Sequence, residues 1–201
     1  MKSLKNILKK IVLTIIAICF WLFVWQFLSH KIDKSIFLPS PEETMLALKR
    51  IGKEKDFWRI IFNSFGKIAK GFGLAVVCGI LLGVIAHFCK IIDFLLSPLM
   101  KLIKAVPVAS FIILALLWIK SQQLSVLISF IMVMPVIYIN LQQGFENVDI
   151  EILEMAKVYH IDTGKKMRFI YLPCLLPSFV AACKIGLGFC FKSGIAAEII
   201  G

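Results

Sequence analysis

Long apolar runs alternate with short polar segments along this chain. The runs cover residues 11–28, 57–88, 94–119, 124–141 and 173–191. A helix of about twenty apolar residues, rising about 1.5 Å per residue, crosses the roughly 30 Å hydrocarbon core of a bilayer. The core of a soluble domain needs no apolar runs of that length. The pattern therefore predicts an all-α, polytopic membrane protein with five transmembrane helices.

The N-terminal region combines a lysine-rich flank with the first apolar run, and we expect a transmembrane helix over residues 1–28. The run is longer than the apolar part of a signal peptide, and no small-residue cleavage site follows it. Residues 29–56 are polar and mixed in charge. Pro41, followed by Glu42 and Glu43, suits the first turn of a helix. We expect an extracytoplasmic loop that carries one short surface helix.

Prolines and glycines mark special positions within the spans. Pro98 and Pro107 are expected to bend or break the third span, because proline lacks a backbone N–H and clashes with the preceding turn. The second span contains Gly79 and Gly83, a small-residue spacing that lets two helices approach closely in lipid. That spacing fits general helix packing as well as a dedicated dimer contact.

The composition of the chain excludes several classes of function. The chain carries 23 Lys plus Arg against 12 Asp plus Glu, a formal net charge of +11, and 60% of its residues are hydrophobic. Lysines that flank apolar spans meet anionic lipid, so we expect bilayer lipid and no nucleic acid as a partner. The six cysteines lack C-x-x-C spacing and the three histidines lack a second ligand at helical spacing, so the sequence predicts no metal site.

The spans also lack the clusters of His, Asp or Glu that a membrane-embedded enzyme would need. No catalytic residue and no cofactor is therefore expected, and the chain is predicted not to be an enzyme. A secondary transporter driven by an ion gradient is a further alternative. It would be supported by broken helices at paired positions, whereas the sequence offers a single polar helical hairpin.

Basic residues suggest the orientation in the cell membrane. With a cytoplasmic N-terminus, the cytoplasmic segments hold the N-terminal lysines, Lys90 and a basic group between the fourth and fifth spans. The lysines and arginine of residues 29–56 weigh against this orientation, because acids count little in the positive-inside rule. We expect a multi-pass protein of the cell membrane with its N-terminus in the cytoplasm.

The polar segment between the fourth and fifth spans is then cytoplasmic, and it reads as two short helices joined at a bend. Asp149 can cap the first helix. Ile152, Met155, Ala156 and Tyr159 follow at helical spacing and form an apolar stripe. Asp162 or Thr163 can cap the second helix, which carries Lys165, Lys166 and Arg168. The stripe either docks on a soluble partner or packs back on the chain's own helices.

The order of residues in this segment resembles the E-A-A, G, I-x-L-P signature of permease subunits of ABC import systems. The matching residues are Glu154, Met155, Ala156, His160, Ile170, Leu172 and Pro173. Met155 replaces an alanine of the pattern and His160 replaces its glycine. Histidine at the bend must either adopt a backbone conformation that favours glycine or open the bend.

Other segments resemble the nitrate, sulfonate and taurine branch of these permeases over nearly the whole chain, among them "LPSPEETMLAL", "NSFGKIAKGFGLAVVCGILLGVIA" and "GIAAEIIG". The resemblance implies the type I ABC importer permease fold, with the permease core in residues 57–201 and a cytoplasmic coupling loop in residues 145–172. Such permeases have a sixth span after the region matching "AAEIIG", so we expect a fragment from which this C-terminal span is missing.

The resemblance also implies partners. The chain has no G-x-x-x-x-G-K-[ST] loop, so separate ABC ATPase subunits would hydrolyse ATP. A second permease subunit, in a homodimer, and an extracytoplasmic solute-binding protein would complete the system. The residues implied in coupling to the ATPase are Glu154, Met155, Ala156, Tyr159, His160, Ile170, Leu172 and Pro173.

Polar residues within the spans are the candidates for the solute pathway, because such groups usually face a cavity or another helix. They are Asn140, Lys184 and Lys192, with Glu198 near the outer end. Lys184 would favour an anion such as a sulfonate, taurine-like or nitrate-like solute, although it could equally extend to the membrane interface. A related branch that imports a vitamin precursor, methionine or betaine is the alternative.

Overall fold

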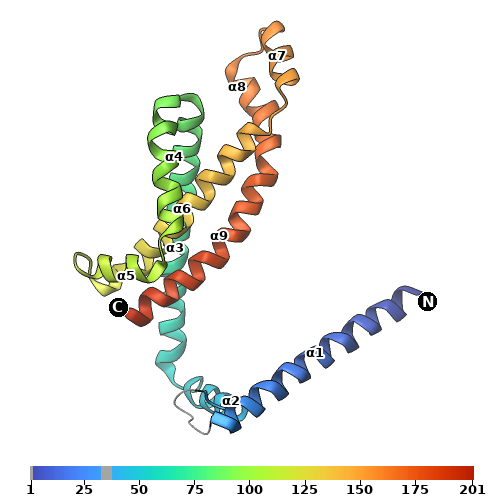
Figure 1. Cartoon of the computed structure of the whole chain (residues 1–201), viewed down its shortest axis with the longest axis vertical. Coiled ribbons are helices and arrows are strands. Elements are labelled where there is room, and N and C mark those ends of the chain that lie inside the picture. The colour runs from blue at the N-terminus through green and yellow to red at the C-terminus, as the bar shows by residue number, and fades with distance from the viewer. Residues whose placement is uncertain (1, 33–37) are drawn as a thin grey trace. The chain divides into compact units, whose positions relative to one another are not determined.

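The computed structural model describes residues 2–32 and 38–201, and within them the chain is helical with no β-strand, as predicted (Figure 1). The elements are α1 (Lys2–Ile32), α2 (Pro41–Ile51), α3 (Lys55–Phe88), α4 (Lys90–Ala105), α5 (Val108–Leu116), α6 (Ser121–Glu146), α7 (Ile150–Val158), α8 (Thr163–Lys166), a π-helical turn (Met167–Tyr171) and α9 (Leu172–Ile200). The chain divides into two compact units, Met1–Ile61 and Phe62–Gly201.

The first unit holds α1, α2 and the start of α3. The predicted surface helix is α2, and Ser40 caps it in a capping box with Glu43, with Pro41 in its first turn. The indole N–H of Trp25 donates to the carbonyl of Pro39 at 3.0 Å, and Ser29 Oγ donates to the carbonyl of Leu38 at 2.9 Å. These bonds tie the segment before α2 to the end of α1.

Four helical segments of the described chain are long and apolar enough to cross a membrane: Ile7–Lys31, Lys55–Phe88, Ser121–Glu146 and Thr163–Ile200. The predicted third span is α4 plus α5, and these two helices meet at an angle of 98°. The break falls at Pro107, where Val106 is held in the extended conformation that precedes proline, whereas α4 continues through Pro98. If the bent pair is one span, the total is the predicted five.

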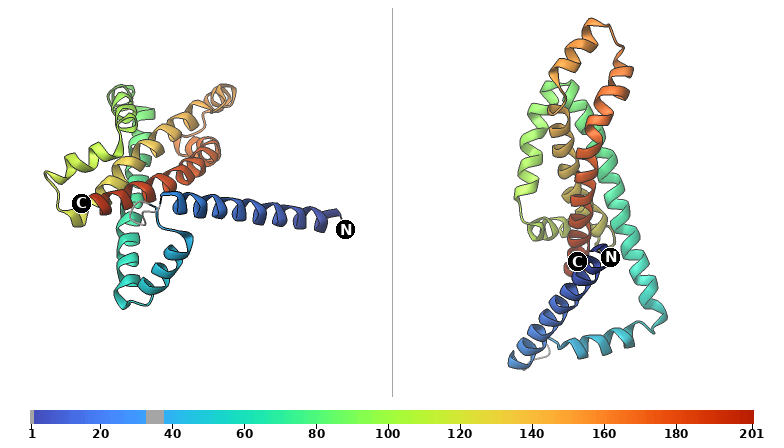
Figure 2. Two further views of the ribbon diagram at one scale, coloured as in Figure 1. Left: turned by 60° about the horizontal axis from the view of Figure 1, so that its bottom comes forward. Right: turned by 90° about the vertical axis from the view of Figure 1, so that its right-hand side faces the viewer.

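In the second unit, α6 is the central helix. Of its most apolar stretch, 61% is buried, against 28% for α3 and 22% for the Thr163–Ile200 segment. Helices α6 and α9 pack along each other in both views (Figures 1 and 2), and α4 and α5 also contact α6. Buried side chains of α3, α6 and α9 form the largest apolar cluster, which includes Ile68, Val133 and Cys190.

Glycines allow α3 to approach α6 closely. A Cβ on Gly79 would lie 2.8 Å from the Cβ of Ile137, and a Cβ on Gly83 would lie 3.4 Å from that of Leu141. The small-residue spacing predicted for close packing therefore serves a contact within this chain. Because α6 is held on several sides, it fixes the position of the polar segment that follows it.

Candidate functional site

The segment after α6 begins with a capped helix, as predicted. The carboxylate of Asp149 accepts the backbone N–H of Glu151 at 2.9 Å, so it satisfies one of the donors that a helix start leaves free. Glu151 lies in the first turn, where the helix dipole favours an acid. Helix α7 then runs from Ile150 to Val158. Together with α8 it forms one tip of the second unit, at the same end as the turn between α3 and α4 (Figures 1 and 2).

Helix α7 ends in a Schellman motif at His160. The N–H of Ile161 donates to the carbonyl of Ala156 at 2.9 Å, and the N–H of His160 donates to the carbonyl of Lys157 at 3.1 Å. This geometry requires a left-handed residue, and His160 has a φ of 50°. Of the two expected outcomes, histidine therefore adopts the conformation that favours glycine, and the bend keeps its sharp form.

Most of the predicted stripe on α7 is exposed. Ala156 is buried, but Met155 is 53% exposed and Tyr159 is 73% exposed, and Ile152 is also exposed. Val158, outside the stripe, is 75% exposed. Of the four residues of the stripe, only Ala156 is therefore buried within the chain itself. The exposed apolar side chains, with Glu154 beside them, form a surface that we call the α7 face.

The second predicted helix is short, and Asp162 caps it by accepting the N–H of Gly164 at 3.1 Å. It is not separate from the last span, however. It continues through the π-helical turn into α9, so that Thr163–Ile200 is one uninterrupted helical segment of 38 residues. Pro173 explains the turn, because a proline N–H is missing and its ring would clash with the carbonyl of Phe169; a wider turn accommodates both.

The later motif residues lie along this continuous segment. Ile170 is half-buried in the π-helical turn, whereas Leu172 and Pro173 are exposed at the start of α9. They are therefore placed in the connection between the tip and the span. Their part in coupling stays a prediction.

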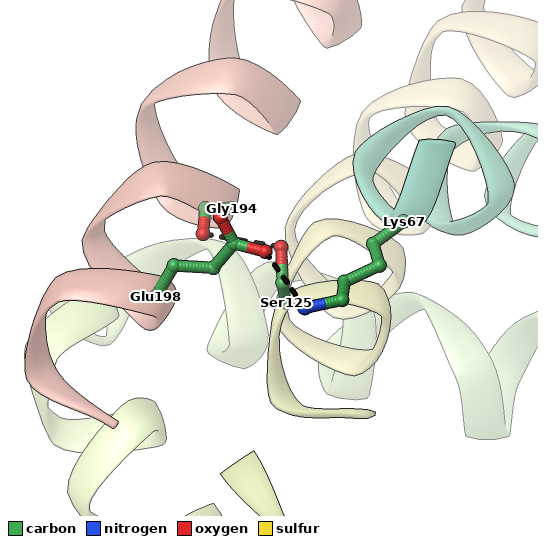
Figure 3. A network of polar contacts seen from close by, with 4 residues as sticks. All are labelled: Lys67, Ser125, Gly194 and Glu198. Atoms are coloured by element: carbon green, nitrogen blue, oxygen red, sulfur yellow. Dashed lines mark hydrogen bonds and ion pairs between the residues drawn. The ribbon is translucent and has the colours of Figure 1, made fainter. Parts of the chain in front are cut away.

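The pathway candidates are spread over two helices. The amide of Asn140 donates to the carbonyl of Val136, in its own helix, at 2.8 Å. Lys184 and Lys192 are exposed on α9. Glu198 forms an ion pair with Lys67 of α3, with Nζ and Oε1 3.2 Å apart (Figure 3).

Sequence analysis missed Lys67, although a lysine inside an apolar helix calls for a partner. Next to the ion pair, Ser125 Oγ of α6 donates to the carbonyl of Gly194 at 3.2 Å (Figure 3). The space is tight, because a Cβ on Gly194 would lie 2.6 Å from Cγ1 of Ile68. The contacts thus join α3, α6 and α9 at the end opposite to α7.

Sequence analysis also missed a polar cavity of about 480 Å³ between α4 and α6. Lining residues on α4 are Lys90, Asp93, Ser97 and Lys101, and polar lining residues on α6 are Tyr138, Gln142, Gln143 and Glu146. The four α4 residues follow one another at intervals of three or four positions, and so do Tyr138, Gln142 and Glu146 on α6, which is the spacing of one helix face. This periodicity of polar residues within apolar helices is the signal that could have found the cavity.

Asp93 is the centre of a hydrogen-bonded network in this cavity. Its Oδ1 accepts the hydroxyl of Tyr138 at 2.8 Å and the side-chain amide of Gln142 at 3.4 Å. Tyr138 is 1% exposed. The network therefore fixes the start of α4 against the part of α6 that leads into α7. In the part of the chain that the structure describes, no group of three His, Cys, Asp or Glu side chains could hold a metal ion.

Comparison with known proteins decides the family. The sequence model described as binding-protein-dependent transport system inner membrane component matches residues 75–201, more than half of the chain. The chain belongs to this permease family. The ABC importer resemblance and the expected type I permease fold are confirmed, and the chain is accordingly a multi-pass membrane protein of the transport-subunit class.

Individual relatives of this permease share about a quarter of its sequence. A Bacillus subtilis protein named for aliphatic sulfonates transport is 26% identical over 89% of this chain and 65% of its own length. A bicarbonate transport permease of Synechococcus elongatus is 26% identical over 100% of this chain and 76% of its own. A taurine transport permease of Escherichia coli is 23% identical over 88% and 66%. The chain thus spans about two thirds to three quarters of the length of these relatives.

Proposed function

We propose that this permease forms the membrane pathway for a small solute and that α7 couples it to a partner ATPase. The observation that carries the proposal is the α7 face, on which Met155 and Tyr159 are exposed at the tip of a capped helix. Exposed apolar side chains of this size, grouped on one short helix, are typical of a docking surface. Glu154 supplies a charge that can fix the register of the docked helix.

The local structure keeps α7 in one shape. Asp149 holds its start and the left-handed His160 holds its end, while Ala156 between them is buried. A helix with both ends fixed loses little conformational freedom on binding, which favours docking.

Movement of the tip would reach the membrane through the continuous segment. Because Thr163–Ile200 is one helix, a displacement of α7 and α8 by the ATPase turns or shifts α9 directly. Helix α9 packs along α6, so the shift changes the packing of the spans. We propose that this change in packing opens the solute pathway alternately to the inside and to the outside of the membrane as the ATPase hydrolyses ATP.

The remaining partners follow from the family. We infer a homodimer of permease subunits, an extracytoplasmic solute-binding protein, and an N-terminus in the cytoplasm, on the side where α7 meets the ATPase. The names of the relatives support a small solute with an acid group, since they specify aliphatic sulfonates, bicarbonate and taurine. The ATPase subunits, and not this chain, would hydrolyse ATP.

Purification of the full-length permease from its own host tests the coupling proposal. We expect an ATPase to co-purify with the wild-type chain, and we expect Glu154→Lys or deletion of residues 154–164 to abolish both the association and solute uptake. Glu42→Lys makes the same charge reversal on the exposed surface of α2 and should leave both unchanged. Wild-type uptake by the Glu154→Lys variant, or failure to crosslink an ATPase from position 159, would contradict the proposal.

A further inference from the structure

Three aromatic rings meet where the polar segment joins the spans. The imidazole of His87, one residue before the end of α3, is stacked on the ring of Phe145 in the last turn of α6, with ring centroids 4.0 Å apart and an interplanar angle of 9°. The ring of Tyr171 meets His87 edge to face at 5.4 Å and Phe145 at 5.7 Å. Each of the three rings therefore contacts the other two.

The two partners of His87 lie near the two ends of the predicted coupling loop, residues 145–172. Phe145 comes shortly before α7 in the chain, and Tyr171 is the last residue of the π-helical turn that follows α8. His87 itself belongs to α3, which is not part of this loop. It therefore links a third helix to both ends of the coupling loop.

Burial makes the stack a firm contact. Phe145 is 4% exposed and belongs to the apolar cluster of α3, α6 and α9, against which Tyr171 packs. A Cβ on the neighbouring Gly144 would lie 2.9 Å from Cδ2 of Leu175, so α6 and α9 are close together here. In such close packing, empty space cannot absorb a shift of one ring, and the shift displaces the neighbouring rings.

Tyr171 occupies the position at which movement of the loop would first reach the other two rings. Its π-helical turn is closed by the N–H of Leu172, which donates to the carbonyl of Met167. Single turns of this kind inside α-helices are frequent at functional sites. A displacement of α8 changes the direction of the Tyr171 ring, and with it the edge-to-face contact with His87, because the energy of such a contact depends on the angle between the rings.

We propose that His87 is a positioning residue that transmits movement of the coupling loop to α3. The inference rests on the proposed coupling function and extends it, since α9 receives the movement through the chain and α3 receives it through the ring of His87. The same two helices are joined at the end opposite to α7 by the ion pair of Lys67 and Glu198. Two spans then respond together to one loop, and opening of the pathway does not depend on α9 alone.

Amide hydrogen exchange of the full-length permease with its ATPase, in nanodiscs, tests this. The probe is adenylyl imidodiphosphate, an ATP analogue that is not hydrolysed. The readout is the change in exchange on adding the analogue, followed separately for α7 and for residues 84–88 at the end of α3. In the wild type we expect both segments to respond, α3 by roughly fivefold, the lower end of the usual coupling between two sites. No response of α3 in the wild type would overturn the proposal.

Variants identify the residue that transmits the change. His87→Ala should abolish the response of α3 and leave that of α7, and His87→Phe, which keeps an aromatic ring for stacking, should restore it. Phe65→Ala is the matched control. It removes another aromatic contact between α3 and α9, with Phe191 at 5.8 Å, and should leave both responses as in the wild type. A loss of packing alone alters exchange with and without the analogue alike, so it does not change this readout.

The outcomes separate this inference from the coupling proposal. If His87→Ala does not assemble with the ATPase, Tyr171→Leu breaks the same contact from the side of the loop and should give the same result. A wild-type response of α3 in His87→Ala, or no recovery in His87→Phe, overturns this inference alone. A lack of response of α7 in the wild type contradicts the coupling proposal itself, and this inference with it.

Discussion

The carbonyl of Ala156 accepts the N–H of Ile161 at 2.9 Å, and this bond closes α7 only because the intervening His160 is left-handed. For a residue with a Cβ, that conformation costs roughly 1–2 kcal/mol. The end of the proposed coupling helix is therefore strained, at the position where the family signature has glycine.

His160→Gly is expected to stabilise the last turn of α7 by about 1 kcal/mol, because glycine has no Cβ to clash in the left-handed region. Amide hydrogen exchange of residues 156–161 measures this, and the change should slow exchange roughly fivefold. His160→Ala keeps the Cβ and should stay close to the wild-type rate. Equal slowing in both variants would show that strain at this backbone position is not the cause.

Loss of the cap at the other end should have the opposite effect. Asp149→Ala removes the acceptor for the N–H of Glu151 and is expected to destabilise α7 by about 1 kcal/mol. Exchange of the Glu151 amide should quicken roughly fivefold. Asp149→Ser retains a capping oxygen and should restore most of the protection. If serine and alanine behave alike, the hydrogen bond does not stabilise the helix.

Local features of the coupling segment could be predicted from the sequence because neighbouring residues determine them. The cap and the bend each depend on a few positions in the chain: the cap at Asp149 is present as predicted, and of the two outcomes expected at His160 the left-handed backbone is the one observed. The exposure of Met155 and Tyr159 could not be decided in the same way. It depends on which face of α7 meets the rest of the unit.

Contacts between helices could not be predicted from the sequence either, because they depend on how distant parts of the chain pack together. Lys67 and Glu198 are 131 positions apart, and their pairing follows from how α3 and α9 are rotated against α6. The polar cavity likewise requires that the polar faces of α4 and α6 point toward each other. Proline indicated that the third span would bend or break, but the 98° angle depends on how α5 packs on α6 and α9.

Two glycine-to-alanine substitutions on α3 distinguish the effect of close helix packing on stability from the effect of helix propensity. A Cβ on Gly79 would lie 2.8 Å from that of Ile137, so Gly79→Ala should destabilise the protein by about 1–3 kcal/mol. Gly73 has no neighbour within 4 Å of the same position, so Gly73→Ala should be neutral or stabilise by up to about 1 kcal/mol. Thermal stability in detergent, followed by size-exclusion chromatography, checks this. Similar losses in both variants would indicate that close approach to α6 is not the determinant.

The ion pair of Lys67 and Glu198 is expected to hold α3 against α9 at the end of the unit opposite to α7. Both side chains keep some contact with solvent, 35% and 22%, so the coupling energy should be modest, about 0.5–1 kcal/mol. Lys67→Glu and Glu198→Lys should each lower the stability, because each places two like charges together. The double variant should recover most of the loss, since it restores an opposite pair at the same 3.2 Å contact. Unfolding of the four proteins by titration with denaturing detergent measures the cycle, and additive losses in the double variant would mean that the two side chains do not interact in the membrane.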